Sequence, residues 1–172
     1  MGTVGHELDD AQKEFNKQCD ECSVGPIAVD LFRFVDDRGI LDQLFNLDLP
    51  NSFPFGVKRI YTTVSNKGII RGMHGHQREW KAFYVANGMV KFVVYKMGEE
   101  PDLLGYETKT FVLSDAKPQL FILPPGYWHG YMSLTENARI IILSSASLEE
   151  TKKDDHREDP EKFKWEFEVK GR

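Results

Sequence analysis

Short apolar segments closed by turn residues recur along most of the chain, and this pattern restricts the fold more than any other feature. Residues 56–64 read as a strand and end at the turn signal SNKG, 65–68. Residues 82–86 are followed by Asn87-Gly88, a strong hairpin signal, and 89–97 are expected to form the returning strand. Further strands are expected at 27–34, 109–113, 120–123 and 138–144. With 14 glycines, 8 prolines and 12% aromatic residues, the chain is predicted to form an all-β sandwich or barrel.

The two ends of the chain depart from this pattern. Residues 1–25 are polar and are interpreted as an N-terminal arm with a short helix at 7–18, while residues 26–172 form one domain. The segment 149–161 is charged and is expected to consist of turns. Residues 163–169 alternate strictly between apolar and polar, which is typical of an edge strand.

Charge and cysteine content exclude several classes of function. The chain has 22 Lys+Arg and 27 Asp+Glu, a net charge of -5, which disfavours a nucleic acid polymer as partner because phosphate binding needs a basic face. Cys19 and Cys22 are too few for a closed zinc site and are interpreted as reduced thiols. No apolar run is long enough to span a membrane, so no membrane association and a cytoplasmic location are expected.

Two glycine-bearing motifs contain three of the five histidines. His74 and His76 lie in GIIRGMHGH, residues 68–76, and His129 lies in PPGYWHG, residues 124–130. Together these motifs resemble those of the cupin superfamily. The resemblance implies an all-β cupin jelly roll, also called a double-stranded β-helix, preceded by the short N-terminal helical arm.

Metal-binding cupins carry a glutamate ligand at a position that is Lys81 in this chain. An ammonium group is not a metal ligand, and its charge repels a divalent cation. Glu79 is two residues away, a displacement along a strand that is too large for most ligand geometries. The sequence therefore predicts a site with no metal and no cofactor, and a displaced metal site using Glu79 is the less favoured alternative.

A metal-free pocket lined by histidine, arginine and lysine suits proton abstraction next to a carbonyl group. His74 is a candidate general base, and Arg71 and Lys81 are candidates to stabilise an oxyanion or to hold phosphate. An isolated His-X-His pair is more often structural, with one ring inside and one outside. Two histidine motifs at this separation favour the functional interpretation.

Five elements occur in the order of a narrower family. They are DRG at 37–39, RGMH at 71–74, Lys81, LPPGYWHGY at 123–131, and Asp159-Pro160 with Trp165. In order and spacing they resemble the dTDP-4-dehydrorhamnose 3,5-epimerase family, which acts on nucleotide-linked 4-keto-6-deoxy sugars. The resemblance implies that His74 is the base, that Lys81 holds the C4 oxyanion, and that a C-terminal acid, Asp155 or Asp159, orients His74.

One position departs from that family. Its general acid is a tyrosine in the strand after the second histidine motif, and a match without gaps places Ile142 there. The candidates for the acid in this chain are Tyr61, Tyr131 or water.

The sugar-nucleotide 3,4-ketoisomerases offer a second resemblance. PFGVKRIY at 54–61, both histidines of 71–76 and Trp128 carry it. It implies that Tyr61, with His74 and His76, moves a proton between C3 and C4 on one face of the sugar. Lys81, the loop at 98–110 and Asp159-Pro160 favour the epimerase. A third alternative is a non-catalytic cupin that binds a sugar nucleotide, which the absent tyrosine supports.

The expected partner is a dTDP- or GDP-linked sugar, held partly by contacts away from the reacting carbons. Arg59 or Lys58 is a candidate for the diphosphate, and Phe55, Tyr61 or Trp128 for stacking on the base. The resemblance also implies a homodimer. The candidate substrate contacts are Arg71, His76, His129, Arg59, Tyr131 and Trp128.

Overall fold

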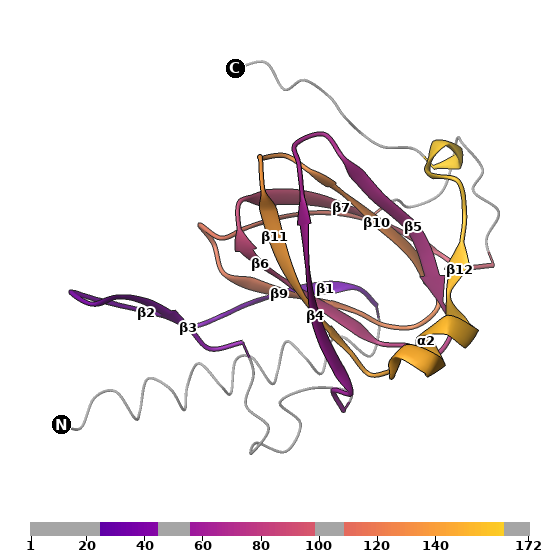
Figure 1. Ribbon diagram of the computed structural model, residues 1–172, viewed down its shortest axis with the longest axis horizontal. Helices are drawn as coiled ribbons and strands as arrows, with labels where there is room; N and C mark the ends of the chain where they lie inside the picture. The colour runs from indigo at the N-terminus through magenta and orange to yellow at the C-terminus, as the bar shows by residue number, and fades with distance from the viewer. Residues whose placement is uncertain (1–24, 45–55, 99–108, 164–172) are drawn as a thin grey trace.

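The computed structural model describes residues 25–44, 56–98 and 109–163. Within them, two five-stranded sheets pack face to face, and a two-stranded hairpin projects to one side (Figure 1). The all-β jelly roll expected from the sequence is confirmed. Outside the described residues lie the expected helix at 7–18, Cys19, Cys22, the loop at 99–108, Phe55, Trp165 and nearly all of the expected strand at 163–169.

All strand pairs within the two large sheets are antiparallel. The first sheet has the order β1 (Ile27–Asp30), β9 (Gln119–Leu123), β6 (Lys81–Asn87), β11 (Ala138–Ser144) and β4 (Arg59–Ser65). The second has the order β12 (His156–Arg157), β5 (Ile70–His76), β10 (Tyr127–Ser133), β7 (Met89–Lys96) and β8 (Lys109–Ser114). The hairpin pairs β2 (Arg33–Asp36) with β3 (Gly39–Asp42), and α2 (Leu148–Asp154) and the 3₁₀ turn η1 (Pro160–Lys162) complete the described elements.

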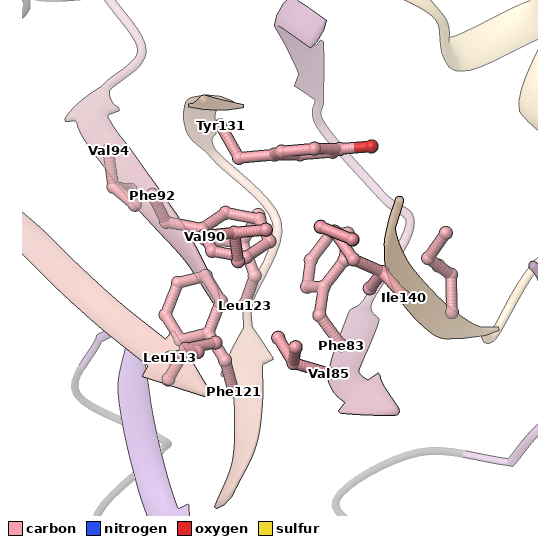
Figure 2. Packing of buried hydrophobic residues seen from close by; sticks show 12 residues of the cluster. Phe83, Val85, Val90, Phe92, Val94, Leu113, Phe121, Leu123, Tyr131 and Ile140 are labelled. Atoms are coloured by element: carbon pink, nitrogen blue, oxygen red, sulfur yellow. The ribbon is translucent and has the colours of Figure 1, made fainter. Parts of the chain in front are cut away.

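The main core lies between the inner faces of the two sheets (Figure 2). Alternate residues of β7, Val90, Phe92 and Val94, belong to this core and are at most 1% exposed. The ring of Phe92 lies 4.9 Å from that of Phe83 on β6, so aromatic contacts bridge the sheets. This packing fills one part of the barrel with apolar side chains. The polar residues Lys81 and His129 lie nearer the starts of β6 and β10, before the buried core residues of those strands.

The predicted hairpin at Asn87-Gly88 is wrong. β6 pairs with β9 and β11, and β7 pairs with β8 and β10, so this turn carries the chain from one sheet to the other. Gly88 has φ +82°, which suits the tight turn, and its N–H donates to Asp115 Oδ2 at 3.0 Å. The turn residues match a hairpin locally, but both strands have inward faces that only opposite sheets can bury together.

The prediction of turns throughout 149–161 is wrong for its first part, which belongs to α2. Ser147 and Glu150 form a capping box, in which Glu150 Oε2 accepts from Ser147 N at 2.7 Å and Ser147 Oγ accepts from Glu150 N at 3.3 Å. The helix ends at Asp154, with Asp155 as its C-cap. This short helix lies beside β5, and β12, which follows it, pairs with β5, so Asp154 and Asp155 are placed next to that strand (Figure 1).

Candidate active site

His74 lies on β5 with its side chain 33% exposed, and its Nδ1 is 3.5 Å from Asp155 Oδ1. Burial and the nearby Lys81 ammonium lower the pKa of His74, while Asp155 opposes that shift. Asp155 also accepts a hydrogen bond from Arg157 Nε at 2.9 Å. Burial disfavours its ionised form, but Arg157, together with His74 and His76, outweighs burial and keeps the pKa of Asp155 low. A carboxylate therefore faces Nδ1 of a neutral imidazole, leaving Nε2 as the basic atom.

The structure distinguishes the two acids that the sequence left open. Asp155 reaches His74, whereas the Asp159 carboxylate caps η1 by accepting from Glu161 N at 2.9 Å. The two differ because Asp155 precedes the short strand β12, which pairs with β5 and carries Asp155 to the base.

Lys81 is the first residue of β6 and its side chain is 9% exposed. Its Nζ lies 2.7 Å from His76 Nε2 and 3.8 Å from Glu79 Oε1. Burial lowers the pKa of Lys81, and the Glu79 carboxylate opposes this. Burial and Lys81 lower the pKa of His76 to about 4, so this imidazole is neutral and accepts from the ammonium. An ammonium has three N–H donors, so Lys81 can bind His76 and an oxyanion together.

Glu79 is a member of the site that the sequence suggested only as a displaced metal ligand. Its side chain is 1% exposed, and its Oε1 accepts from Ser144 Oγ at 2.6 Å. Arg59 Nη2 lies 3.6 Å from the same oxygen, so Arg59 and Lys81 share one carboxylate. A buried cation is costly without such a partner. Glu79 lies in the turn before β6, two residues before Lys81, and this short separation is the signal that could have indicated it.

Tyr61 on β4 is flanked by Arg59, whose guanidinium carbon lies 4.8 Å from the centre of the phenol ring. Burial and the Glu79 carboxylate raise the pKa of Tyr61 to about 12, so the phenol is protonated at neutral pH. Arg59 also donates to Thr151 Oγ1 at 2.9 Å. Arg59 therefore lies within the inner network, while its neighbour Lys58 forms an exposed ion pair with Glu150 at 2.7 Å.

Arg71 and Tyr131 meet at a separate point, on Ser65. Arg71 Nε donates to Ser65 Oγ at 3.0 Å, and the Tyr131 hydroxyl is 3.0 Å from the same oxygen. The Tyr131 ring packs in the apolar core, 5.3 Å from Phe92, so only its hydroxyl end is polar (Figure 2). The cation that shares a carboxylate with Lys81 is thus Arg59, and Arg71 is hydrogen-bonded at the end of β4.

His129 joins the two histidines of β5 from the neighbouring strand β10, where it is the direct partner of His74. Its ring centre lies 6.0 Å from that of His74 and 5.6 Å from that of His76. Burial, followed by Lys81 and the other histidines, holds the pKa of His129 well below its ordinary value. Trp128, which precedes His129, points to the other face of the sheet, and its ring centre lies 6.1 Å from that of Phe163.

Close contact between β5 and β10 explains the small residues of both motifs. A Cβ on Gly72 would lie 2.6 Å from Gly130 Cα, far inside van der Waals contact, and Gly72 has φ +153°. The register of the two strands shifts between His129 and Tyr131 at this point. The irregularity lets His74 and Arg71 both pair with inward-facing residues of β10.

Among residues 25–44, 56–98 and 109–163, no group of three or more His, Cys, Asp or Glu side chains is arranged to hold a metal ion. Lys81 occupies the centre of the cluster and binds His76 Nε2, the atom that would face a metal. The described helices are too short and too polar to cross a bilayer.

A sequence profile of the dTDP-4-dehydrorhamnose 3,5-epimerase family matches residues 24–169, most of the chain. The protein belongs to this family. Its members include epimerases and ketoisomerases of nucleotide sugars, so the chain is an isomerase of the nucleotide-sugar class. The family resemblance and the cupin jelly roll expected from the sequence are confirmed.

Three relatives illustrate the range of the family. The spore coat polysaccharide biosynthesis protein SpsL of Bacillus subtilis is 29% identical over 112 residues, 65% of this chain and 72% of SpsL. ChmJ, a 3'-monoepimerase from Streptomyces bikiniensis solved with dTDP-quinovose, superposes with a TM-score of 0.67 at 20% identity, covering 79% of this chain and 70% of ChmJ. QdtA, a sugar 3,4-ketoisomerase from Thermoanaerobacterium thermosaccharolyticum solved with TDP, has a TM-score of 0.63 at 24% identity, covering 81% and 92%. At these identities the two solved structures indicate the fold alone.

Proposed function

We propose that this protein is a metal-independent epimerase of a nucleotide-linked 4-keto-6-deoxyhexose. The observation that carries the proposal is that His74 and Tyr61 belong to opposing sheets, β5 in one and β4 in the other. Epimerisation removes a proton from one face of a carbon and returns one to the other face. A neutral imidazole on one wall and a protonated phenol on the other supply a base and an acid for this exchange.

Proton abstraction begins at the carbon next to the C4 ketone. His74 Nε2 takes the proton, and Asp155 stabilises the imidazolium that forms at Nδ1. The electron pair of the broken C–H bond moves to the ketone oxygen and creates an enolate. Lys81 donates to that oxygen, and its positive charge, held in a largely buried site, stabilises the enolate more strongly than water would.

Tyr61 completes the reaction as the general acid by protonating the carbon from the opposite face. A phenol with a pKa of about 12 is almost fully protonated at neutral pH, and the Arg59 guanidinium over its ring stabilises the phenolate that remains. The phenolate and the imidazolium then exchange protons with solvent, which restores both groups. Tyr131 is less suited to this role because its hydroxyl is held by Ser65, and its ring packs in the core.

Some of the other candidate residues are proposed to bind the substrate. His129 borders His74 and can contact the sugar, and Arg71 is a proposed contact for the diphosphate. Trp128 is not proposed as a contact, because it points to the other face of its sheet and packs near Phe163. The nucleotide is proposed to be dTDP, and GDP is the alternative to be tested. Arg59 is proposed to support Tyr61 and to assist binding, since its guanidinium lies in the inner network.

We also propose a homodimer formed through the β2–β3 hairpin. Val35, Ile40 and Leu41 are 70%, 62% and 58% exposed, which is a large apolar exposure for so short a hairpin. A second copy of the chain is the partner that the family resemblance implies.

The proposal is tested by incubating the enzyme in heavy water with dTDP-4-keto-6-deoxyglucose and, separately, its GDP counterpart. The expected NMR result is deuterium at C3, at C5 or at both, with inverted configuration at the labelled carbon. Absence of deuterium at both carbons with both nucleotides would refute it. A carbonyl found at C3 would instead identify a 3,4-ketoisomerase, the alternative that the resemblance at 54–61 and 71–76 implies.

A further inference from the structure

Asp154, the last residue of α2, ties the helix to the turn between β5 and β6. Its Oδ1 accepts from Gln77 N at 3.0 Å, and its Oδ2 accepts from Arg78 N at 2.9 Å and from Glu79 N at 3.0 Å. Burial disfavours the charged carboxylate, but these three hydrogen bonds outweigh burial and lower the pKa of Asp154. The side chain is therefore ionised and firmly attached to the turn at neutral pH.

The main-chain carbonyl of the same residue reaches the reaction site. His76 Nδ1 lies 2.9 Å from Asp154 O, and because a carbonyl only accepts, Nδ1 must carry the proton. The remaining nitrogen, Nε2, then has the lone pair that accepts from Lys81 Nζ at 2.7 Å. Asp154, together with Glu79 Oε2 at 3.4 Å from the same nitrogen, thus favours the tautomer of His76 that can hold the lysine as a cation.

The residue that follows is the partner of the base. Consecutive Cα atoms are separated by about 3.8 Å, so the anchoring of Asp154 also limits where Asp155 can lie. Asp155 Oδ1 is 3.5 Å from His74 Nδ1. We infer that Asp154 is a positioning residue that aligns both halves of the site, the Asp155–His74 pair and the His76–Lys81 pair. This inference rests on the proposed function, in which His74 and Lys81 perform the chemistry.

Other contacts hold the same segment to the barrel at a distance from the site. At the start of α2, Glu150 and Lys58 form an ion pair whose side chains are both about half exposed. Beyond Asp155, Glu158 and Met73 exchange two backbone hydrogen bonds of 3.1 and 3.3 Å. These contacts are expected to keep the segment folded when Asp154 is replaced, so the variant loosens the alignment without releasing the helix.

A double-mutant cycle tests the inference, with Asp154→Ala and Asp155→Asn made singly and together. Deuterium exchange into dTDP-4-keto-6-deoxyglucose is the assay. Asp154→Ala alone is expected to lower kcat about 100-fold with little change in KM, because misplacing a catalytic pair by about 1 Å has effects of this size. In the Asp155→Asn background the same change is expected to cost clearly less than about 100-fold, because one of the two pairs that Asp154 aligns is already impaired while the His76–Lys81 pair remains. Equal losses in both backgrounds would overturn the inference.

Asp154→Asn and Glu150→Gln complete the set of variants. An asparagine keeps one accepting oxygen but turns an N–H₂ group toward backbone N–H donors, so an intermediate loss of kcat is expected. Glu150 lies on the same helix as Asp154, and Glu150→Gln removes its ion pair with Lys58 but keeps a side chain that can cap the helix. Wild-type rates are therefore expected. A loss in Glu150→Gln equal to that in Asp154→Asn would show that general loosening of α2, rather than Asp154, is responsible.

Nitrogen-15 NMR of the imidazoles, recorded without substrate, separates failure of the inference from failure of the proposed function. Wild-type His76 is expected as the Nδ1–H tautomer, and its signal is identified by its loss in His76→Asn. In Asp154→Ala a mixture of tautomers and a shifted His74 pKa are expected. An unchanged spectrum in the folded variant would refute the positioning role even if wild-type turnover is found. Absence of turnover in the wild type would refute the proposed function alone.

Discussion

Tyr61 on β4 is the direct cross-strand partner of Ile142 on β11. Side chains of directly opposed residues point to the same face of a sheet with Cβ atoms about 4.5–5.5 Å apart. Ile142 is 4% exposed and belongs to the inner core, so Tyr61 points to the same face beside it, with 37% of its surface exposed. The family resemblance implies a tyrosine where Ile142 stands. The neighbouring strand therefore offers a phenol within one strand spacing of that position.

Replacing Tyr61 by phenylalanine should separate the two halves of the reaction. We expect inversion to slow by about 10²–10³-fold, the range for loss of a general acid, while His74 still exchanges the substrate proton with retention. NMR of the product formed in heavy water measures both the inversion and the exchange of the substrate proton. Tyr84→Phe is the matched control, because its hydroxyl binds Asp42 at 2.6 Å, and its ring belongs to a different core cluster. If Tyr61→Phe inverts the substrate as fast as the wild type, the general acid is another residue. Partial recovery of the inversion rate in the double variant Tyr61→Phe/Ile142→Tyr would support a phenol on this face as the acid.

The acidic limb of the pH profile of kcat/KM should reflect the pKa of His74. The base must be neutral, and its pKa is lowered from 6.5, so kcat/KM is expected to fall only as pH drops below 6.5. Asp155 raises this pKa, and Asp155→Asn is therefore expected to move the acidic limb to still lower pH while reducing kcat. A limb that shifts to higher pH in Asp155→Asn would contradict the proposed pairing.

The alkaline limb of the same profile should reflect the pKa of Lys81. This group must be charged to hold the enolate, and its pKa lies below 10.5, whereas Tyr61 loses its proton only near 12. Glu79 raises the Lys81 pKa, so Glu79→Gln is expected to move the alkaline limb of kcat/KM to lower pH. Glu150→Gln serves as a control carboxylate outside the site. If the alkaline limb of Glu79→Gln coincides with that of the wild type, Glu79 does not control the lysine.

Gly72→Ala should destabilise the fold, because the added Cβ would lie 2.6 Å from Gly130 Cα. Overpacking of this kind costs about 1–3 kcal/mol, measurable as a lower midpoint in urea unfolding. Gly56→Ala is the control, since its Cβ would meet no atom within 4 Å. Equal midpoints for the two variants would mean that β5 can move away from β10 at little cost.

Leu41→Lys should dissociate the proposed dimer, because it places a charge on the exposed apolar hairpin. Light scattering after size exclusion is expected to give the 19.8 kDa monomer mass, against about twice this value for the wild type. Val112→Lys, at a residue of β8 that is 53% exposed, provides a control on another surface. A monomeric wild-type protein would refute the dimer.

Local sequence signals located most of the elements and both histidine motifs. The strands expected at 82–86, 89–97, 109–113 and 138–144 all lie within or across β6, β7, β8 and β11. The turn at 147–150 was missed as a helix start, although its Ser-X-X-Glu pattern is a capping box. The expected arm at 1–25 and the final strand at 163–169 stay predictions, apart from their few described residues.

The sequence by itself determined the barrel class through its strand periodicity and the family through its motifs, and it named His74 and Lys81 as candidates whose roles stay predictions. Only the tertiary structure decided that Asp155 rather than Asp159 meets His74 and that Glu79 shares its charge with Lys81 and Arg59. It also decided that Asn87-Gly88 joins two sheets. Each of these depends on long-range strand pairing, which follows from the two sheets burying their inner faces together and which no short segment encodes by itself.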